Sequence, residues 1–165
     1  MVAMTQDLTP ELVKDWLKSV VDPEIPTVSL VDLGVIYDVA IENGNQVKVK
    51  MTPTFAGCPA IQLMRMEAEA CLKNHGIEHA EVEITHNKPW SSDNLTEAGK
   101  EGLKQHGLAL PPPSKVLDQD EIPPAVCPQC GSSNTQMMSP FGPTACRALH
   151  HCYDCHESFE QFKPL

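Results

Sequence analysis

Apolar residues recur at three- and four-residue spacing in two segments of the chain, as the buried face of a helix requires. The first segment, 9–21, opens with Thr9 as a hydroxyl cap and Pro10 at the first helical position. The second segment, 59–76, ends in glycine, a common residue after a helix. A third helix is expected at 96–106, although its two glycines lower its helix propensity.

Two other segments alternate between apolar and polar residues, which is the pattern of half-buried strands. Residues 35–51 alternate on both sides of Asn43 and Gly44, a turn that tolerates positive φ, and therefore predict a β-hairpin. Residues 80–84 alternate again and predict a third strand. The order helix, hairpin, helix, strand, helix predicts an α+β fold in which helices pack on a small mixed sheet.

The segment 109–125 is rich in proline and acidic residues and lacks the apolar periodicity of the regions beside it. Such a composition is typical of a semi-rigid linker between domains. We therefore predict two domains, an α+β domain at 8–108 and a small zinc ribbon at 126–165.

The zinc ribbon is predicted from two Cys-x-x-Cys pairs, Cys127 with Cys130 and Cys152 with Cys155. Two such pairs about 20 residues apart can place four thiolates around one tetrahedral ion. Few large apolar side chains surround them, so we expect a structural ion, with zinc as the metal. Iron in a rubredoxin-like redox site uses the same sulfur geometry and is the alternative. The nearby histidines are interpreted as surface residues: His150, His151 and His156.

Composition and charge exclude several functional classes. Seven cysteines, with no signal peptide and no apolar run near 18 residues, indicate a reducing cytoplasm and argue against a membrane span. A net charge of −10 argues against nucleic acid as a partner, which would require a basic face. Phosphate-binding loops of the GxGxxG or GxxxxGK type are absent, as are HExxH and GxSxG.

The other three cysteines occur in different contexts. Cys58 precedes Pro59, so we expect it to cap the second helix, where the helix dipole would lower its pKa; an incidental apolar residue at a corner is the alternative. Cys71 lies on the apolar stripe of that helix and should be part of the core. Cys146 has no partner at ligand spacing and is interpreted as a buried residue beside the metal site. Trp90 should cover the edge of the core.

Four short motifs occur in one order over the first domain: Asp22-Pro23-Glu24-Ile25-Pro26, Asp32-Leu33-Gly34, Thr52-Pro53-Thr54-Phe55-Ala56-Gly57-Cys58-Pro59-Ala60 and Pro89-Trp90. Together they resemble the iron-sulfur cluster assembly domain family. The resemblance implies that Cys58 is the functional thiol and that its neighbours are Asp22, Glu24, Thr52 and Thr54. It also implies a transiently bound iron or iron-sulfur cluster and no catalytic reaction. Because a lone cysteine cannot saturate a cluster, either a homodimer or ligands from a partner are expected.

The whole chain, including 141–149 and the second cysteine pair, resembles the D-subunit family of the bacterial phenylacetyl-CoA epoxygenase (ring 1,2-epoxidase) system. This resemblance implies a maturation factor in phenylacetate degradation, whose partner is the reductase or the di-iron oxygenase subunit of that complex. Two alternatives stay open. The chain could be a structural or electron-carrying subunit of the oxygenase, with iron in the four-sulfur site, or a general zinc-ribbon interaction module that does not need Cys58.

Overall fold

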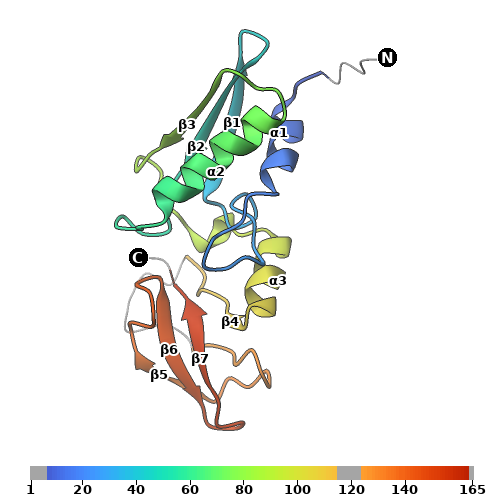
Figure 1. The fold of residues 1–165 in the computed structure, drawn as a ribbon. Helices are drawn as coiled ribbons and strands as arrows, with labels where there is room; N and C mark the ends of the chain where they lie inside the picture. Colours follow the sequence, from blue (N-terminus) through green and yellow to red (C-terminus); the bar gives the residue numbers. More distant parts are fainter. Residues whose placement is uncertain (1–6, 115–123, 164–165) are drawn as a thin grey trace.

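The computed structural model describes residues 7–114 and 124–163, which form an α+β domain and a ribbon at one end of it (Figure 1). The middle of the expected linker, 115–123, lies outside the described residues. Within the described part, no helix is long and apolar enough to cross a membrane.

The α+β domain contains a three-stranded sheet of order β1-β2-β3. Strands β1 (Ile36–Glu42) and β2 (Gln46–Met51) form the expected antiparallel hairpin, and β3 (Ala80–Ile84) pairs in parallel with β2. Both turn residues have the predicted positive φ, 52° at Asn43 and 85° at Gly44. The predicted hairpin and mixed sheet are therefore confirmed.

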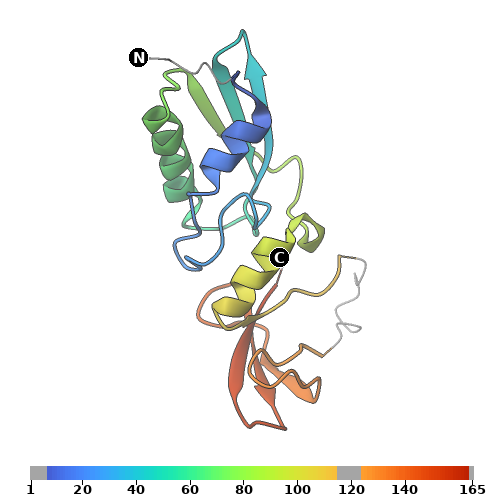
Figure 2. The ribbon, with the colours of Figure 1, turned by 90° about the vertical axis from the view of Figure 1, so that its right-hand side faces the viewer.

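Helices α1 (Pro10–Leu17) and α2 (Ile61–Asn74) pack against each other and against the sheet (Figures 1 and 2). Thr9 caps α1 as expected, but the helix ends before Val21 and is shorter than predicted. The chain turns after Leu17, and Val21 forms an isolated bridge with Ser29. Backbone pairing across the acidic, proline-containing loop thus takes the place of the last helical turn that the sequence predicted.

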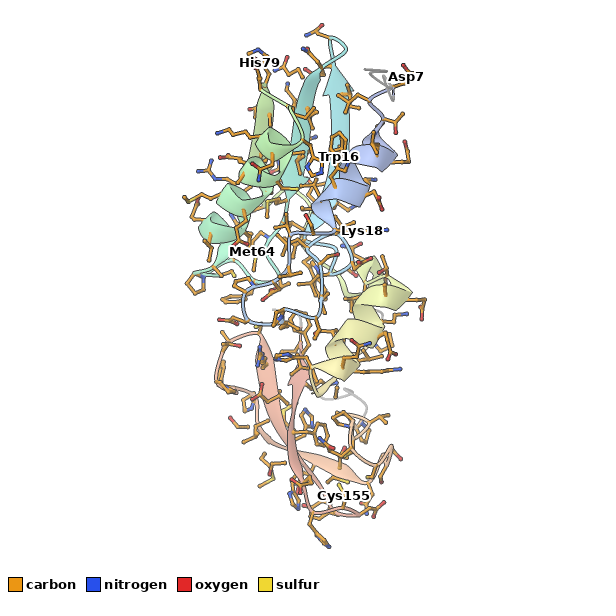
Figure 3. All side chains as sticks on the ribbon, turned by 45° about the vertical axis from the view of Figure 1, so that its right-hand side comes forward. Asp7, Trp16, Lys18, Met64, His79 and Cys155 are labelled. Carbon is orange, nitrogen blue, oxygen red and sulfur yellow. The ribbon has the colours of Figure 1, made fainter. Side chains whose placement is uncertain are left out.

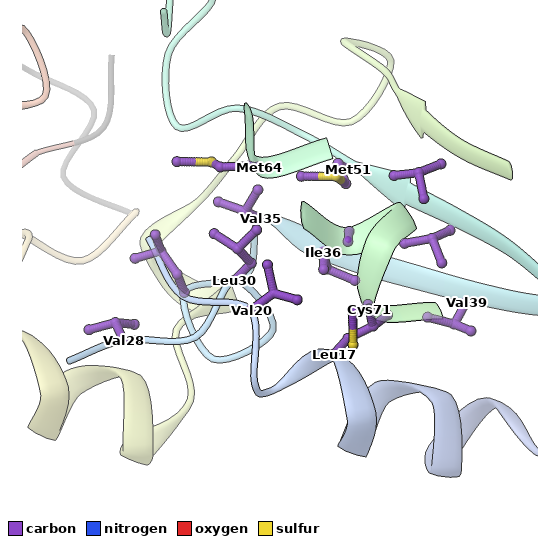
Figure 4. Packing of buried hydrophobic residues seen from close by; sticks show 14 of the residues in the cluster. Leu17, Val20, Val28, Leu30, Val35, Ile36, Val39, Met51, Met64 and Cys71 are labelled. Atoms are coloured by element: carbon purple, nitrogen blue, oxygen red, sulfur yellow. The ribbon is translucent and has the colours of Figure 1, made fainter. Parts of the chain in front are cut away.

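The core lies between the two helices and the sheet and is built from aliphatic side chains, with two methionines and Cys71 among them (Figure 4). The sheet also has a polar face, where Lys48 lies 3.1 Å from Glu42 and Lys50 lies 3.6 Å from Asp38. These pairs are solvent-exposed and contribute little to stability. The alternation of the strands therefore separates a buried face from a charged one, as their sequence pattern predicts.

Helix α3 (Glu97–Gln105) follows a 3-10 turn, η1 (Ser92–Asn94), and is capped by Thr96 as predicted. Its glycines serve close packing. A Cβ atom on Gly102 would lie 2.4 Å from the carbonyl oxygen of Thr27, so only glycine lets the helix approach this loop. The sequence feature that weakens the helix by itself therefore allows it to dock.

The ribbon contains a four-stranded sheet of order β4-β7-β6-β5. Strands β5 (Thr135–Ser139), β6 (Arg147–Cys152) and β7 (Ser158–Phe162) are antiparallel, and the short β4 (Leu108–Ala109) pairs in parallel with β7. Ala125 is also buried in the ribbon, so both ends of the expected linker contact this domain. The predicted fold class, α+β followed by a zinc ribbon, is confirmed, while the boundaries at 108 and 126 stay a prediction.

The two domains share buried residues. Phe162, at the end of β7, belongs to the apolar cluster of the α+β domain and meets the ring of Trp90 edge to face at 5.5 Å. Trp90 is itself buried and donates a hydrogen bond from Nε1 to the carbonyl oxygen of Leu33, at 2.8 Å. Trp90 therefore covers the edge of the core, and Phe162 at the end of the ribbon packs against it.

Candidate functional site

The four cysteines of the two Cys-x-x-Cys pairs form one cluster in the ribbon, with all ligand atoms within 4.8 Å of one another. The Sγ atoms of Cys127 and Cys155 are 3.7 Å apart, and those of Cys130 and Cys152 are 3.6 Å apart. Four sulfurs at ~2.3 Å from a tetrahedral zinc ion lie ~3.8 Å from one another. The predicted ligands thus fit a closed four-thiolate metal site.

Hydrogen bonds hold the two halves of this site in register. Asp154, in the second pair, accepts hydrogen bonds from the hydroxyl of Ser132 at 2.5 Å and from the side-chain amide of Asn134 at 2.7 Å. Gly131, with φ of 77°, turns the chain after the first pair and donates from its backbone N–H to the carbonyl oxygen of Cys127. The site lies at the end of the ribbon remote from the α+β domain, as the position of Cys155 in Figure 3 shows.

The interpretation of His150 as a surface residue is wrong. This side chain is 2 % exposed and its ring stacks on Phe159, with 5.4 Å between the ring centres. Burial lowers the pKa of His150, while the neighbouring side chain of Gln161 raises it. His156 is exposed as expected, and His151 is half-buried. The signal that was missed is the alternation of Ala148, His150 and Cys152 on the inward face of β6.

A second site lies between the two domains, in a cavity of about 330 Å³. Its wall includes Cys58, Asp22, Glu24 and Thr54 from the α+β domain, and the end of the ribbon completes it. Four of the five residues that the resemblance assigned to the functional site therefore line one cavity. The fifth, Thr52, is 1 % exposed and is not among the lining residues.

The expectation that Cys58 caps the second helix is wrong. Helix α2 begins at Ile61 with Ala60 as its cap, and Cys58 lies in the turn before it. Burial raises the pKa of the Cys58 thiol, the Ala60 N–H opposes this, and the nearby Asp22 raises it further. Cys58 is therefore a protonated thiol at neutral pH, half-buried in an electronegative cavity.

Hydrogen bonds hold the acidic turn, which lines the same cavity as this thiol. One oxygen of the buried Asp22 accepts hydrogen bonds from the backbone N–H of Glu24, at 2.8 Å, and of Ile25, at 3.1 Å. Burial raises the pKa of Asp22, while these hydrogen bonds and the charge of Arg147 lower it. Arg147 also donates to the carbonyl oxygen of Glu24, at 3.2 Å, so a ribbon residue fixes the turn from the other domain.

The remaining two cysteines have different surroundings. Cys71 is buried on the inner face of α2, with Sγ 3.4 Å from the carbonyl oxygen of Trp16, as its apolar stripe predicts. Cys146 is buried, but it lines the interdomain cavity and does not lie beside the four-cysteine cluster. Its position was missed because the loop before β6 and the turn at Cys58 meet only in the folded structure, and no local spacing signals that contact.

The comparisons with known proteins match both parts of the chain. Residues 10–84 match the family described as iron-sulfur cluster assembly protein, and residues 111–163 match the PaaD zinc beta ribbon domain. The chain is 33% identical over 157 residues to a putative subunit of the 1,2-phenylacetyl-CoA epoxidase of Escherichia coli, covering 93% of each chain.

Two further relatives resemble the first domain. The iron-sulfur protein maturation auxiliary factor YitW of Bacillus subtilis is 31% identical over 99 residues, which is 59% of this chain and 96% of that protein. A crystal structure of a domain of unknown function from Bacillus anthracis has a TM-score of 0.53 and 29% identity, and covers 57% of this chain and 90% of that one.

Fold and site together define an iron-sulfur assembly domain joined to a four-cysteine ribbon. This chain belongs to the PaaD family, in which these two parts occur together along one chain. The predicted resemblance is therefore confirmed for both parts.

Proposed function

We propose that this protein is a maturation factor for the phenylacetyl-CoA epoxygenase complex of aerobic phenylacetate degradation. It binds iron or an iron-sulfur cluster as cargo at Cys58 and transfers it to the reductase or to the di-iron oxygenase subunit. The proposal rests chiefly on one observation, a half-buried thiol in a cavity whose wall also contains two acidic side chains. The similarity to maturation factors and to an epoxidase subunit supports it.

The chemistry of the cavity suits a cation as cargo. Thiolates and carboxylates are ligands of iron, and Asp22 and Glu24 supply negative charge on the cavity wall. Because the pKa of Cys58 is raised, the thiol retains its proton until a cation arrives. Binding then exchanges the S–H bond for an S–metal bond and releases a proton.

The ribbon has a supporting role in this proposal. Its four-thiolate site has no free ligand position, which is typical of structural zinc. Zinc bound there would maintain the sheet whose far end, with Phe162, forms part of the cavity wall. We therefore assign zinc to the four cysteines and the cargo to the interdomain cavity.

Metal content of the client tests the function. In cells carrying Cys58→Ala, the epoxygenase subunits should accumulate and assemble but contain too little iron, and phenylacetyl-CoA oxidation should be lost. Epoxygenase already loaded with metal should turn over in vitro without this chain. If the loaded complex stays inactive until this protein is added in stoichiometric amounts, the maturation role is wrong. Cys71→Ala is the matched control, since Cys71 is buried away from the cavity.

A second candidate is a structural or electron-carrying subunit of the oxygenase, because the E. coli relative is named as a subunit of the epoxidase. Electron transfer requires iron in the four-cysteine site. Elemental analysis of the purified protein separates the maturation factor from the electron carrier: zinc without a visible chromophore supports the former, whereas a red iron protein supports the latter.

A further inference from the structure

We propose that Cys146 is a second cargo ligand and that Cys58 and Cys146, one from each domain, bind the same transition-metal ion in the interdomain cavity. This inference rests on the proposed function, because it takes iron as the cargo. It goes beyond that function by placing part of the cargo site in the ribbon.

The evidence begins with the shared cavity. Cys58 and Cys146 both line it, together with the carboxylates of Asp22 and Glu24. Its volume of about 330 Å³ greatly exceeds the ~10–15 Å³ that one water molecule requires, so a hydrated ion can enter. Two thiols and two carboxylates around one accessible space form a set of ligands that neither domain contains alone.

The position of Cys146 is fixed by contacts on both sides of it. Its carbonyl oxygen accepts a hydrogen bond from the backbone N–H of Lys163, at 2.8 Å, which ties it to the end of β7. The next residue, Arg147, forms an ion pair with Glu160 at 2.9 Å and donates to the carbonyl oxygen of Glu24. These contacts hold the Cys146 loop against the acidic turn.

Cys146 belongs to the same buried cluster as Cys71, but it also lines the cavity. Its Sγ lies 3.1 Å from the hydroxyl of Thr144. Burial raises its pKa, and the negative charges of Glu24 and Asp22 raise it further. Cys71, by contrast, contacts the backbone of α1 and is not among the residues that line the cavity. An acidic environment destabilises a bare thiolate but stabilises one that is bound to a cation.

The cavity thiols also differ from the ribbon thiols in completeness. Among the described residues, only the four ribbon cysteines bring three or more ligand atoms within 4.8 Å of one another. The cavity therefore provides an incomplete ligand set, which leaves coordination positions for a client. Binding of one divalent ion breaks two S–H bonds, forms two S–metal bonds and releases two protons to solvent, with no change of oxidation state.

Cobalt(II) provides a spectroscopic probe for this site in the full-length, zinc-loaded protein under anaerobic conditions. Cobalt binds such ligands more weakly than zinc, so it should leave the ribbon site occupied by zinc. Wild type should develop thiolate-to-cobalt absorption. Cys58→Ser and Cys146→Ser should each lose about half of its intensity and bind cobalt roughly tenfold more weakly, and the double variant should show none. Cys71→Ser should match wild type.

The outcomes separate this inference from the proposed function. Zinc content, measured for every variant, confirms that the ribbon is intact, and Cys146→Ala serves if the serine variant does not fold. If Cys146→Ser binds cobalt as wild type does while Cys58→Ser does not, the second ligand is wrong and the role of Cys58 stands. Wild-type protein that shows no thiolate-to-cobalt absorption overturns the two-thiol site, and the iron content of the client then tests the proposed function independently.

Discussion

The α+β domain and the ribbon use cysteine in opposite ways. The α+β domain is stabilised by a large cluster of aliphatic side chains, and its Cys58 is left facing a cavity. The buried cluster of the ribbon is small and consists of Ala109, Ala125, Cys127, Cys152 and Phe159. Two of these residues belong to the four-cysteine cluster that could hold a metal ion, so we expect the ribbon to depend on a bound ion for its stability.

The difference shows how a single residue type can be structural or functional. Four thiols that converge on one point leave no room for exchange, and such a site is suited to permanent binding. A thiol in an open cavity with few partners can accept and release a ligand. A domain with its own core can tolerate such a site, because folding does not require it to be filled.

The largest expected effect comes from breaking the closed site. Cys130→Ser should release the metal and unfold the ribbon, because structural zinc contributes apparent free energies of about 10–16 kcal/mol in small zinc domains. The α+β domain should remain folded at a lowered melting temperature, since it loses the buried Phe162. Calorimetry and elemental analysis measure both effects. Cys58→Ser should retain its zinc; full zinc occupancy in Cys130→Ser, or iron in wild type, would contradict the comparison.

The next effect concerns the contact between the two regions. Phe162→Ala should destabilise the protein by about 3–5 kcal/mol, because the side chain is 1 % exposed and its removal leaves a cavity beside Trp90. Phe141→Ala is the matched control, with an effect of about 0.5 kcal/mol or less, because Phe141 is 65 % exposed. Equal losses for the two variants in urea denaturation would show that the domains do not share a core.

The three helices and the three-stranded sheet of the α+β domain, and the cysteine pairs of the ribbon, could be predicted from the sequence because their signals are local, whereas the strands of the ribbon were not predicted. The hairpin turn at Asn43-Gly44, the caps at Thr9 and Thr96 and the two cysteine pairs each act within a few residues. The errors arose where tertiary contacts determine where an element begins or ends. The end of α1 depends on pairing between Val21 and Ser29, a competition that helical periodicity does not reveal.

The candidate site could be predicted only in part. The motifs identified Cys58, Asp22, Glu24 and Thr54, which the structure gathers around one cavity. The prediction that the pKa of Cys58 is lowered was wrong, because packing determines both the start of α2 at Ile61 and the burial of the thiol. Cys146 lines this cavity only because the ribbon packs against the α+β domain. No local pattern in the sequence predicts that contact between the two domains.

A smaller effect tests whether the α+β domain depends on the close packing of α3, as we expect the ribbon to depend on a bound metal. Gly102→Ala should cost about 1–3 kcal/mol, because the added Cβ would lie 2.4 Å from the carbonyl oxygen of Thr27 and α3 must shift. Gly57→Ala is the control, since its nearest neighbour would be 3.7 Å away. Thermal melting of the two variants measures the difference, and an unchanged melting temperature for Gly102→Ala would rule out this packing constraint.

The smallest expected effect concerns thiol reactivity in the zinc-loaded protein. Brief iodoacetamide labelling followed by mass spectrometry should modify Cys58 before Cys71, because Cys58 is half-buried and Cys71 is buried. Burial raises the pKa of Cys58 above its ordinary value, so labelling should be slow at neutral pH. The rate should still be rising at a pH where an exposed thiol has reached its plateau.

The raised pKa of Cys58 determines how stability changes with pH and how one substitution changes the labelling rate. The protonated thiol favours the folded state, so its contribution is present at neutral pH and is lost as the pH rises through the raised pKa. Asp22→Asn removes a negative charge that raises this pKa and should speed labelling by about two- to threefold, because burial is the larger cause. Glu81→Gln, on the charged face of the sheet, should not change it. Faster labelling of Cys71 than of Cys58, or a plateau below the ordinary thiol pKa, would show that Cys58 is not the open thiol of this comparison.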